Sequence, residues 1–311
     1  MRSFIGIMAF LICTQVKGQQ TVQFTQYIFN GFAINPALAG SKPCIDVKLG
    51  YRTQWVGFEG APKTTFASAN GELKFKKDKN IRTKHGVGVY VESEKIGPIK
   101  KTTMYLAYAY HFPLSRGVTA STGVFAGLQE MRLDASKISV VDGGDPLIRG
   151  SGARFMIPDI SPGFFISHKD WFTGFSIRQA FPKKWGLIGS DKTKNTLHYL
   201  LVGGKRFETG NAINVVPSGM LKWTGYTNPS LDLNLLFELN HYFEIGASWR
   251  NGDALAGIVK INFLEYFSLG YSFDLTTSKV RLGSSNTHEI IIGIYSCPRG
   301  ASDYLCPAFN Y

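Results

Sequence analysis

Alternation of apolar and polar residues is the feature that most limits how this chain can fold. Residues 231–239 give the clearest case, with only Leu236 out of place. Successive side chains of a β-strand point to opposite faces, so a period of two predicts a strand with one apolar and one polar face. The same period recurs in residues 103–112, 242–250 and 267–274. The chain is therefore expected to be all-β.

About fourteen such segments follow one another between Cys44 and Ser296. Their average repeat of about 21 residues fits a meander of tilted strands of about 10 residues each. Asn251-Gly252-Asp253 and Ser284-Ser285-Asn286 have the composition of hairpin loops. One long interruption, residues 134–158, separates the fifth segment from the sixth. We expect a surface loop or an inward-folded segment there.

Strands of this kind fit either a soluble β-sandwich or a barrel that crosses an outer membrane. The even strand number allows closure with both chain ends on one side, and several apolar faces end in aromatic residues such as Trp249 and Phe273. The opposite faces carry glycine, serine and charged residues, which a packed core rarely accepts. An open sheet edge is costly in lipid. We therefore expect a closed antiparallel transmembrane β-barrel of about 14 strands.

The first 18 residues have the form of an export signal. Arg2 precedes an apolar run from Phe4 to Cys13, and Val16-Lys17-Gly18 suits a signal peptidase, so the mature chain is expected to start at Gln19. No later apolar stretch is long enough for a membrane-spanning helix. Without Arg2 and Lys17, the chain has 32 basic and 22 acidic residues. This charge suits acidic partners or lipid head groups, and we expect no nucleic acid, because no basic run is interleaved with base-stacking aromatic residues.

Two stretches after the signal carry a specific resemblance. In residues 24–41 and 51–73 the matching positions are Phe24, Gln26, Tyr27, Asn30, Asn35, Pro36, Ala37, Gly40, Arg52, Gln54, Trp55, Gly57, Gly60, Ala61, Pro62, Lys63 and Thr64. With these residues the chain resembles the PorP/SprF family of type IX secretion system outer-membrane proteins. Weaker similarity in residues 215–223, 247–257, 269–274 and 288–294 extends it over nearly the whole mature chain.

The resemblance implies a multi-pass β-barrel of the cell outer membrane, surrounded by outer-membrane lipid, that is not an enzyme. Family members work in protein secretion or gliding motility. Their partners are the C-terminal sorting domains of secreted surface adhesins, or other components of the secretion machinery. The alternative is a passive channel for small solutes, which basic residues lining an open lumen would favour. A soluble exported binding module is a third possibility.

Residues 19–43 form an aromatic segment ahead of the first expected strand. Phe24, Tyr27, Ile28 and Phe32 recur at roughly helical spacing, and Asn35-Pro36 ends the pattern. We expect this segment at the periplasmic mouth or inside the lumen, with its large side chains against the inner wall. It would then serve either as a plug or as part of a partner-binding surface.

The stretch after the first strand holds the other candidate binding residues. Gly57, Gly60 and Pro62 indicate a compact bent connection. Trp55 and Phe58 suit a membrane boundary or, if this connection is extracellular, a contact with a client. Arg52 could point into the lumen or into the loop, as an ion-pair partner or a recognition residue.

The cysteines predict a bridge near the periplasmic rim. Cys44 begins the expected barrel (residues 44–296), and Cys297 begins a tail (residues 297–311) that also holds Cys306. Closure of an even-numbered barrel brings the first and last strands together, so we expect Cys297 to bridge either Cys44 or Cys306. Three unlinked cysteines are the alternative.

Enzyme motifs are missing from the sequence. The six histidines are scattered one per segment, and no C-x-x-C pair or G-x-S-x-G turn is present. We therefore expect no catalytic residues, no metal site and no cofactor.

Overall fold

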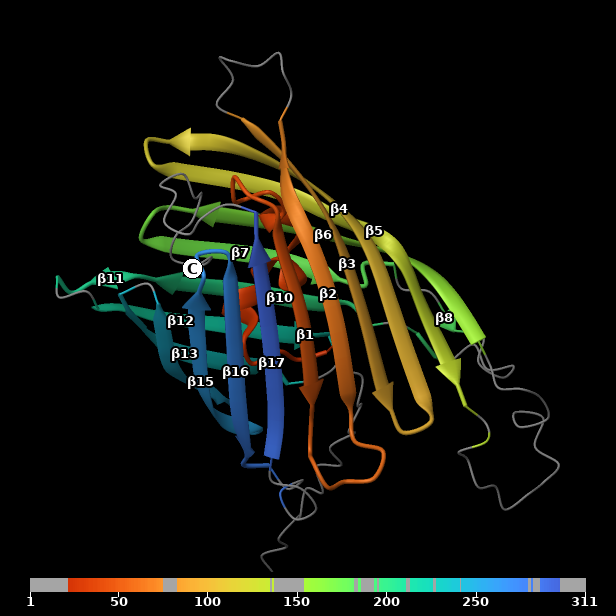
Figure 1. Cartoon of the computed structure of the whole chain (residues 1–311). Helices are drawn as coiled ribbons and strands as arrows, with labels where there is room; N and C mark the ends of the chain where they lie inside the picture. The colour runs from red at the N-terminus through yellow and green to blue at the C-terminus, as the bar shows by residue number, and fades with distance from the viewer. Residues whose placement is uncertain are drawn as a thin grey trace, which may run out of the picture.

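The chain was analysed as a computed structural model that describes residues 22–74, 83–134, 136, 154–181, 184–185, 193–194, 196–210, 213–225, 228–240, 242–278, 281 and 286–296. These residues form a closed antiparallel β-barrel (Figure 1). The expected signal peptide and C-terminal tail lie outside them. None of the helices in the described ranges is both long and apolar enough to cross a bilayer.

Fourteen strands make up the ring, as the sequence predicted. They are β1 Asp46–Thr53, β2 Lys63–Leu73, β3 Lys84–Ile96, β4 Ile99–Ser115, β5 Val118–Leu133, β6 Arg154–Ser167, β7 Trp171–Arg178, β10 His198–Lys205, β12 Ile213–Thr224, β13 Ser230–Leu239, β14 Phe243–Arg250, β15 Ala254–Phe263, β16 Phe267–Thr276 and β17 Asn286–Tyr295. The remaining pieces are β8 Lys184–Trp185, β9 Thr193–Lys194 and β11 Phe207–Glu208. Each ring strand pairs with the next, and β1 pairs with β17 from Asp46 opposite Tyr295 to Thr53 opposite His288.

The apolar faces point outward and the polar faces point into the barrel. On β13, Leu233 is 45% exposed whereas Asp232 is 1% exposed. The same division holds along β16, where Leu269 is exposed and Ser272 is buried. Leu236, the residue that broke the alternation, lies inside among the buried hydrophobic residues. The lipid-facing orientation expected from the sequence is therefore confirmed.

Strand β6 begins earlier than the sequence indicated. Residues 154–158 were assigned to the long interruption, but they pair with β5 from Leu128 to Arg132. Pro158 obscured this strand. Within the described residues β7 pairs with β6 only from Gly163 to Ser167, so Pro158 stands at an edge, where a strand accepts proline. The rest of that interruption lies outside the described residues, except Asp134 and Ser136.

The two rims of the barrel differ in their connections. At the rim that holds Asp46 and Tyr295, several turns are very short, such as residues 116–117, 168–170 and 240–242. At the opposite rim the connections include residues 54–62, 134–153 and 179–197. Outer-membrane barrels have short periplasmic turns and longer extracellular loops. We therefore call the first the periplasmic rim and the second the extracellular rim.

Candidate functional site

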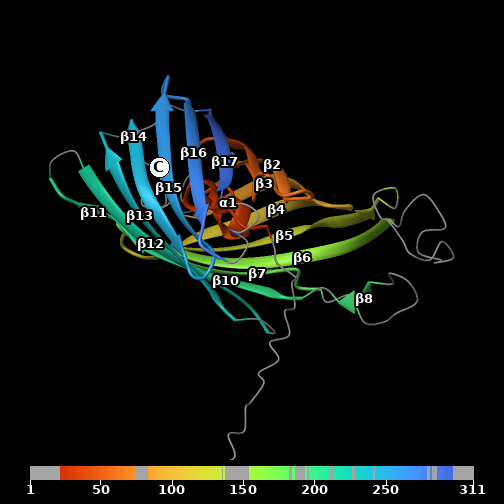
Figure 2. The same ribbon diagram turned by 90° about the horizontal axis from the view of Figure 1, so that it is seen from below.

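The N-terminal segment, residues 22–42, lies inside the barrel (Figure 2). It comprises the 3-10 helix η1 Tyr27–Asn30, the short helix α1 Gly31–Ile34 and the 3-10 helix η2 Pro36–Leu38. Helix α1 ends at Ile34 because a residue before proline avoids helical geometry, and Asn35 is extended. The Asn35 side chain instead caps η2, with its Oδ1 accepting from the Ala37 N–H at 3.0 Å.

The same Asn35 amide joins the segment to two neighbouring strands. Its Nδ2 donates to the carbonyl of Phe164 on β6 at 3.0 Å and to that of Phe175 on β7 at 3.3 Å. Gly163 makes room for it, since a Cβ on that residue would lie 2.2 Å from Asn35 Oδ1. Asn35 and Pro36 are both buried. They therefore fix the middle of the segment to the wall between β6 and β7.

The large side chains of the segment pack against inward-facing rings of the wall. Phe24 meets Phe66 of β2 edge-on at a centroid distance of 4.9 Å. Phe32 meets Phe125 of β5 at 5.2 Å. Ile28 and Tyr27 are buried, and burial raises the pKa of the Tyr27 hydroxyl. Removing these side chains from water provides the hydrophobic contribution to the docking of the segment.

Inward-facing glycines allow the segment to approach the wall closely. A Cβ on Gly86 of β3 would lie 1.8 Å from the Ala39 carbonyl oxygen, and one on Gly123 of β5 would lie 2.6 Å from the Ala37 nitrogen. On the other side of the lumen, a Cβ on Gly270 of β16 would lie 2.3 Å from Gln26 Oε1. At Gly86 and Gly123 the close atoms belong to the backbone, so a larger residue would require the segment backbone to move, whereas at Gly270 the Gln26 side chain would have to move. The wall is therefore shaped to this segment.

Wall side chains also satisfy the backbone of the segment. Short helices leave their last carbonyls without partners inside the helix. Here Arg178 Nη1 donates to the Ala33 carbonyl at 3.0 Å, and Ser176 Oγ donates to the Ile34 carbonyl at 2.7 Å. His111 Nε2 donates to the Ala39 carbonyl at 2.7 Å. The sequence indicated Arg178 only as a basic residue that could line a lumen, and none of the three was predicted to bind the segment.

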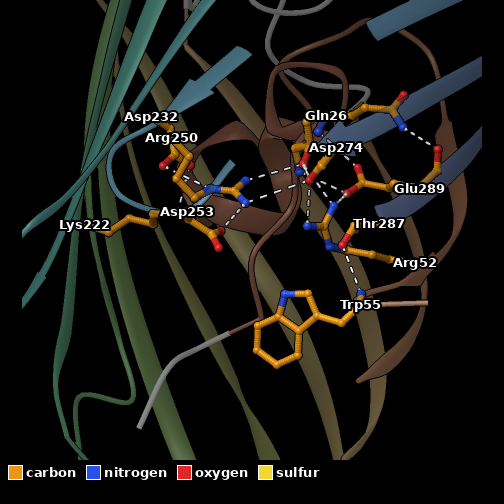
Figure 3. A network of polar contacts seen from close by, with 11 residues as sticks. Gln26, Arg52, Trp55, Lys222, Asp232, Arg250, Asp253, Asp274, Thr287 and Glu289 are labelled. Carbon is orange, nitrogen blue, oxygen red and sulfur yellow. Dashed lines mark hydrogen bonds and ion pairs between the residues drawn. The ribbon is translucent and has the colours of Figure 1, made fainter. Parts of the chain in front are cut away.

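Arg52 is the centre of a buried polar network (Figure 3). Its Nη1 lies 2.7 Å from Glu289 Oε2, and its Nη2 lies 3.0 Å from Asp274 Oδ2. The open question of its direction is thus resolved, since Arg52 is 1% exposed and points into the lumen. Glu289 and Asp274 were not among the predicted site residues, but both fall on inward-facing positions of the alternation.

The N-terminal segment completes this network. The backbone N–H groups of Thr25 and Gln26 donate to the two carboxylate oxygens of Glu289 at 2.9 and 3.0 Å. Thr25 Oγ1 also donates to Asp274 Oδ2 at 2.6 Å. Two buried carboxylates of the wall therefore take part of their hydrogen bonding from residues 25 and 26.

A second arginine extends the network along the wall. Arg250 lies 3.3 Å from Asp232 and 3.0 Å from Asp253, and Lys222 lies 2.8 Å from Asp232. Counted together, the group contains three cations and four carboxylates. The two segment N–H groups satisfy hydrogen-bonding capacity of Glu289, because a buried carboxylate needs donors as well as counter-ions. The docked segment is thus part of the polar network of the barrel.

Trp55 and Phe58 lie apart from this network, in the connection at the extracellular rim. The Trp55 backbone N–H donates to Thr287 Oγ1 at 3.2 Å. Phe58 is 54% exposed. Gly57 and Gly60 have φ angles of +96° and +75°, which glycine adopts readily, so the predicted bent connection is present.

Cys44 is buried and disulfide-bonded. Cys297 and Cys306, with which the bridge was predicted, lie outside the described residues. The pairing therefore stays a prediction.

Two small cavities adjoin the segment among the described residues. A cavity of about 30 Å³ lies between Phe24 and Ile34 on one side and Lys101 and Arg178 on the other. Another, of about 10 Å³, lies between Phe29 and Asp46. Such volumes hold at most a few water molecules. Within the described ranges, no group of three or more His, Cys, Asp or Glu side chains is placed to hold a metal ion.

Comparison with known proteins gives a family and a fold. The family model described as "Type IX secretion system membrane protein PorP/SprF" matches residues 16–294. No curated protein matches the chain.

Similar solved structures include the CymD monoaromatic hydrocarbon channel, with 12% identity, a TM-score of 0.52 and coverage of 86% of this chain and 91% of that chain. The TodX deltaS2S3 mutant monoaromatic hydrocarbon channel has 9% identity, a TM-score of 0.51 and coverage of 85% and 93%. The toluene transporter TbuX of Ralstonia pickettii has 10% identity, a TM-score of 0.50 and coverage of 86% and 92%. At these identities the likeness is one of fold, that of an outer-membrane barrel.

Proposed function

The chain belongs to the PorP/SprF family of type IX secretion system membrane proteins, and from this we propose that it is a plugged outer-membrane anchor for secretion partners. In this role the barrel exports or retains client proteins by binding a client C-terminal sorting domain or a component of the secretion machinery. It catalyses no reaction, and its outer face contacts outer-membrane lipid.

The occupied lumen is the observation that carries the proposal. Residues 22–42 pack against glycines on one side of the wall, and residues 25 and 26 bond to Glu289 and Asp274 on the other. A barrel filled in this way has its surfaces at the rims and loops rather than in a pore. Partner binding is therefore the function that the geometry favours.

The passive-channel alternative has less support. Lys260, one of the basic residues that would line an open pore, is buried and bonded to Glu244 at 2.6 Å. Arg178 is engaged with the Ala33 carbonyl, and Lys100 is exposed on the outer face. The likeness to solved hydrocarbon channels supports the barrel fold of this chain. It is no argument that this barrel conducts. As a channel, the protein would have to release its N-terminal segment.

The two rims provide the test of which partner is bound. Trp55 and Phe58 lie at the extracellular rim, where a surface adhesin would dock. Tyr242 and Leu264, 64% and 74% exposed, lie in turns of the periplasmic rim, where machinery would dock. We therefore pair the variant W55A/F58A with the matched variant Y242A/L264A.

The experiment is a mild-detergent pull-down from native membranes with mass spectrometry, on wild type and both variants. Loss of a sorting-domain protein in W55A/F58A alone supports client anchoring at the extracellular rim. Loss of secretion components in Y242A/L264A alone supports attachment to the machinery. If wild type recruits neither class and conducts ions in a planar bilayer, the anchor proposal is wrong and the channel is favoured.

A further inference from the structure

Five basic residues form one continuous cross-strand row at the extracellular ends of β2 to β6. Lys63 is opposite Lys95, Lys95 is opposite Lys100, Lys100 is opposite Arg132, and Arg132 is opposite Arg154. We call Lys63, Lys95, Lys100, Arg132 and Arg154 the basic row. Adjacent strands are about 4.8 Å apart, so the row spans about 19 Å of the wall.

The basic row faces outward, away from the lumen. All five residues are exposed, and the side chains of Arg132 and Arg154 are 54% and 59% exposed. Their immediate neighbours Thr64 and Glu94 are buried, as alternation requires. The charges are thus presented on the same face of the sheet that meets lipid.

Along each of these strands the outer face changes from apolar to basic toward the extracellular rim. On β3 the order is Val91, Ser93, Lys95, and on β4 it is Met104, Thr102, Lys100. The corresponding triplets on β2, β5 and β6 are Ala67, Thr65, Lys63; Leu128, Glu130, Arg132; and Pro158, Met156, Arg154. Each basic residue therefore lies four residues along its strand from the first residue of its triplet, with one outward-facing residue between them. This places the row next to the head groups of the outer leaflet.

The described strand ends of the opposite wall carry apolar residues instead. At the extracellular ends of β14, β15 and β16 the outward residues are Trp249, Leu255 and Leu275, which are 46%, 48% and 48% exposed. Strands β3 to β6 are also longer, with 17 residues in β4 against 8 in β14. Among the described strand residues, the wall from β2 to β6 therefore carries a row of basic side chains above its apolar positions, whereas the ends of β14, β15 and β16 remain apolar.

Like charges directly opposite each other on neighbouring strands are unfavourable, so a row of this kind favours anions beside it. Glu130 supplies one, accepting from Arg132 Nε at 2.7 Å and from Arg154 Nε. Arginine binds phosphate through paired N–H groups, and a lysine side chain can extend its ammonium along the membrane boundary.

We propose that the basic row binds the phosphate groups of a phosphorylated glycolipid of the outer leaflet, of the lipid A type. A lipid fits better than a soluble protein, because its acyl chains would lie on the apolar positions directly below while its phosphates meet the cations. The hydroxyl groups of Ser93 and Thr102 lie between the apolar positions and the basic row, where they would face the sugar of the glycolipid.

The test uses the purified full chain in detergent, incubated with diphosphoryl lipid A, with its dephosphorylated form, or with inorganic phosphate alone. Bound lipid is measured by native mass spectrometry, and the unfolding temperature is measured in parallel. The variant is K100Q/R132Q, at the centre of the row. The matched control is K169Q/K205Q, which removes two exposed lysines at the periplasmic rim.

We expect wild type and K169Q/K205Q to retain diphosphoryl lipid A, and K100Q/R132Q to bind it at least ten-fold more weakly. Without lipid, K100Q/R132Q should unfold at or above the wild-type temperature, because repulsion is relieved. Equal binding by that variant, equal binding of dephosphorylated lipid, or an equal effect of inorganic phosphate would overturn the proposal. So would a variant that keeps lipid A but loses a co-purifying protein, which would assign the row to a protein partner.

Discussion

Arg52 on the first strand and Glu289 on the last are register partners across the closure of the barrel, and their side chains form a buried ion pair at 2.7 Å. This pair joins the two ends of the sheet on its inner face. Because Glu289 also accepts from residues 25 and 26, the same contact fixes the N-terminal segment.

Removing the Arg52 guanidinium should destabilise the barrel strongly. The change Arg52→Ala leaves Glu289 and Asp274 buried without their nearest cation, which typically costs about 3–5 kcal/mol. We expect a lower unfolding temperature, measured as the temperature at which the folded barrel loses its faster electrophoretic migration. The control is Arg116→Ala, an exposed arginine in the turn between β4 and β5, for which a small effect is expected. Equal unfolding temperatures for Arg52→Ala and wild type would contradict the role assigned to the pair.

Replacing Asn35 with aspartate should destabilise the barrel more than replacing it with alanine. Asn35→Ala loses the donors to the Phe164 and Phe175 carbonyls and should cost about 1–3 kcal/mol. Asn35→Asp replaces those donors with a carboxylate that faces two carbonyl oxygens, so it should destabilise more. Both are measured by thermal unfolding, and the reverse order would show that the amide nitrogen does not make these bonds.

A methyl group at Gly86 should displace the N-terminal segment. The added Cβ would overlap the Ala39 carbonyl oxygen, whereas Gly257 of β15 has nothing within 4 Å of its Cβ position. We expect Gly86→Ala to raise bilayer conductance and to open residues 22–42 to protease, with Gly257→Ala unchanged. If both variants remain equally closed, the segment does not depend on this close approach.

The disulfide of Cys44 should be found with Cys297 or Cys306. Non-reducing peptide mapping of the mature protein gives the connectivity directly. We expect one Cys44 bridge and an unfolding temperature that falls on reduction, because a cross-link between distant parts of a chain restricts its unfolded state. A mature protein with three free thiols would contradict the bridge.

Much of the wall could be predicted from the sequence, because alternation depends only on local residues. The period of two places Leu233 and Asp232 on opposite faces of the same strand. Leu236 shows where this reasoning stops. Its exception to the pattern is explained by the filled lumen, and no local rule says that a lumen is filled.

The contacts of the N-terminal segment could not be predicted in the same way. Thr25 and Glu289 are 264 residues apart, and their meeting depends on closure of the whole ring. The direction of Arg52 was open for the same reason, since alternation gives its face only once the inside of the barrel is known. A charged residue on the polar face of a strand is a usable signal: it indicated Arg178 as a lumen-lining residue, and it would also have identified Asp274 and Glu289.

The bonds from Thr25 and Gln26 to the last strand have a consequence for assembly. The strand that closes the ring is also the one that receives the N-terminal segment, so these bonds can form only once the last strand is in place. The first residues of the mature chain and its last strand therefore reach their final positions together, and a barrel truncated before β17 would leave this part of the segment without its binding site.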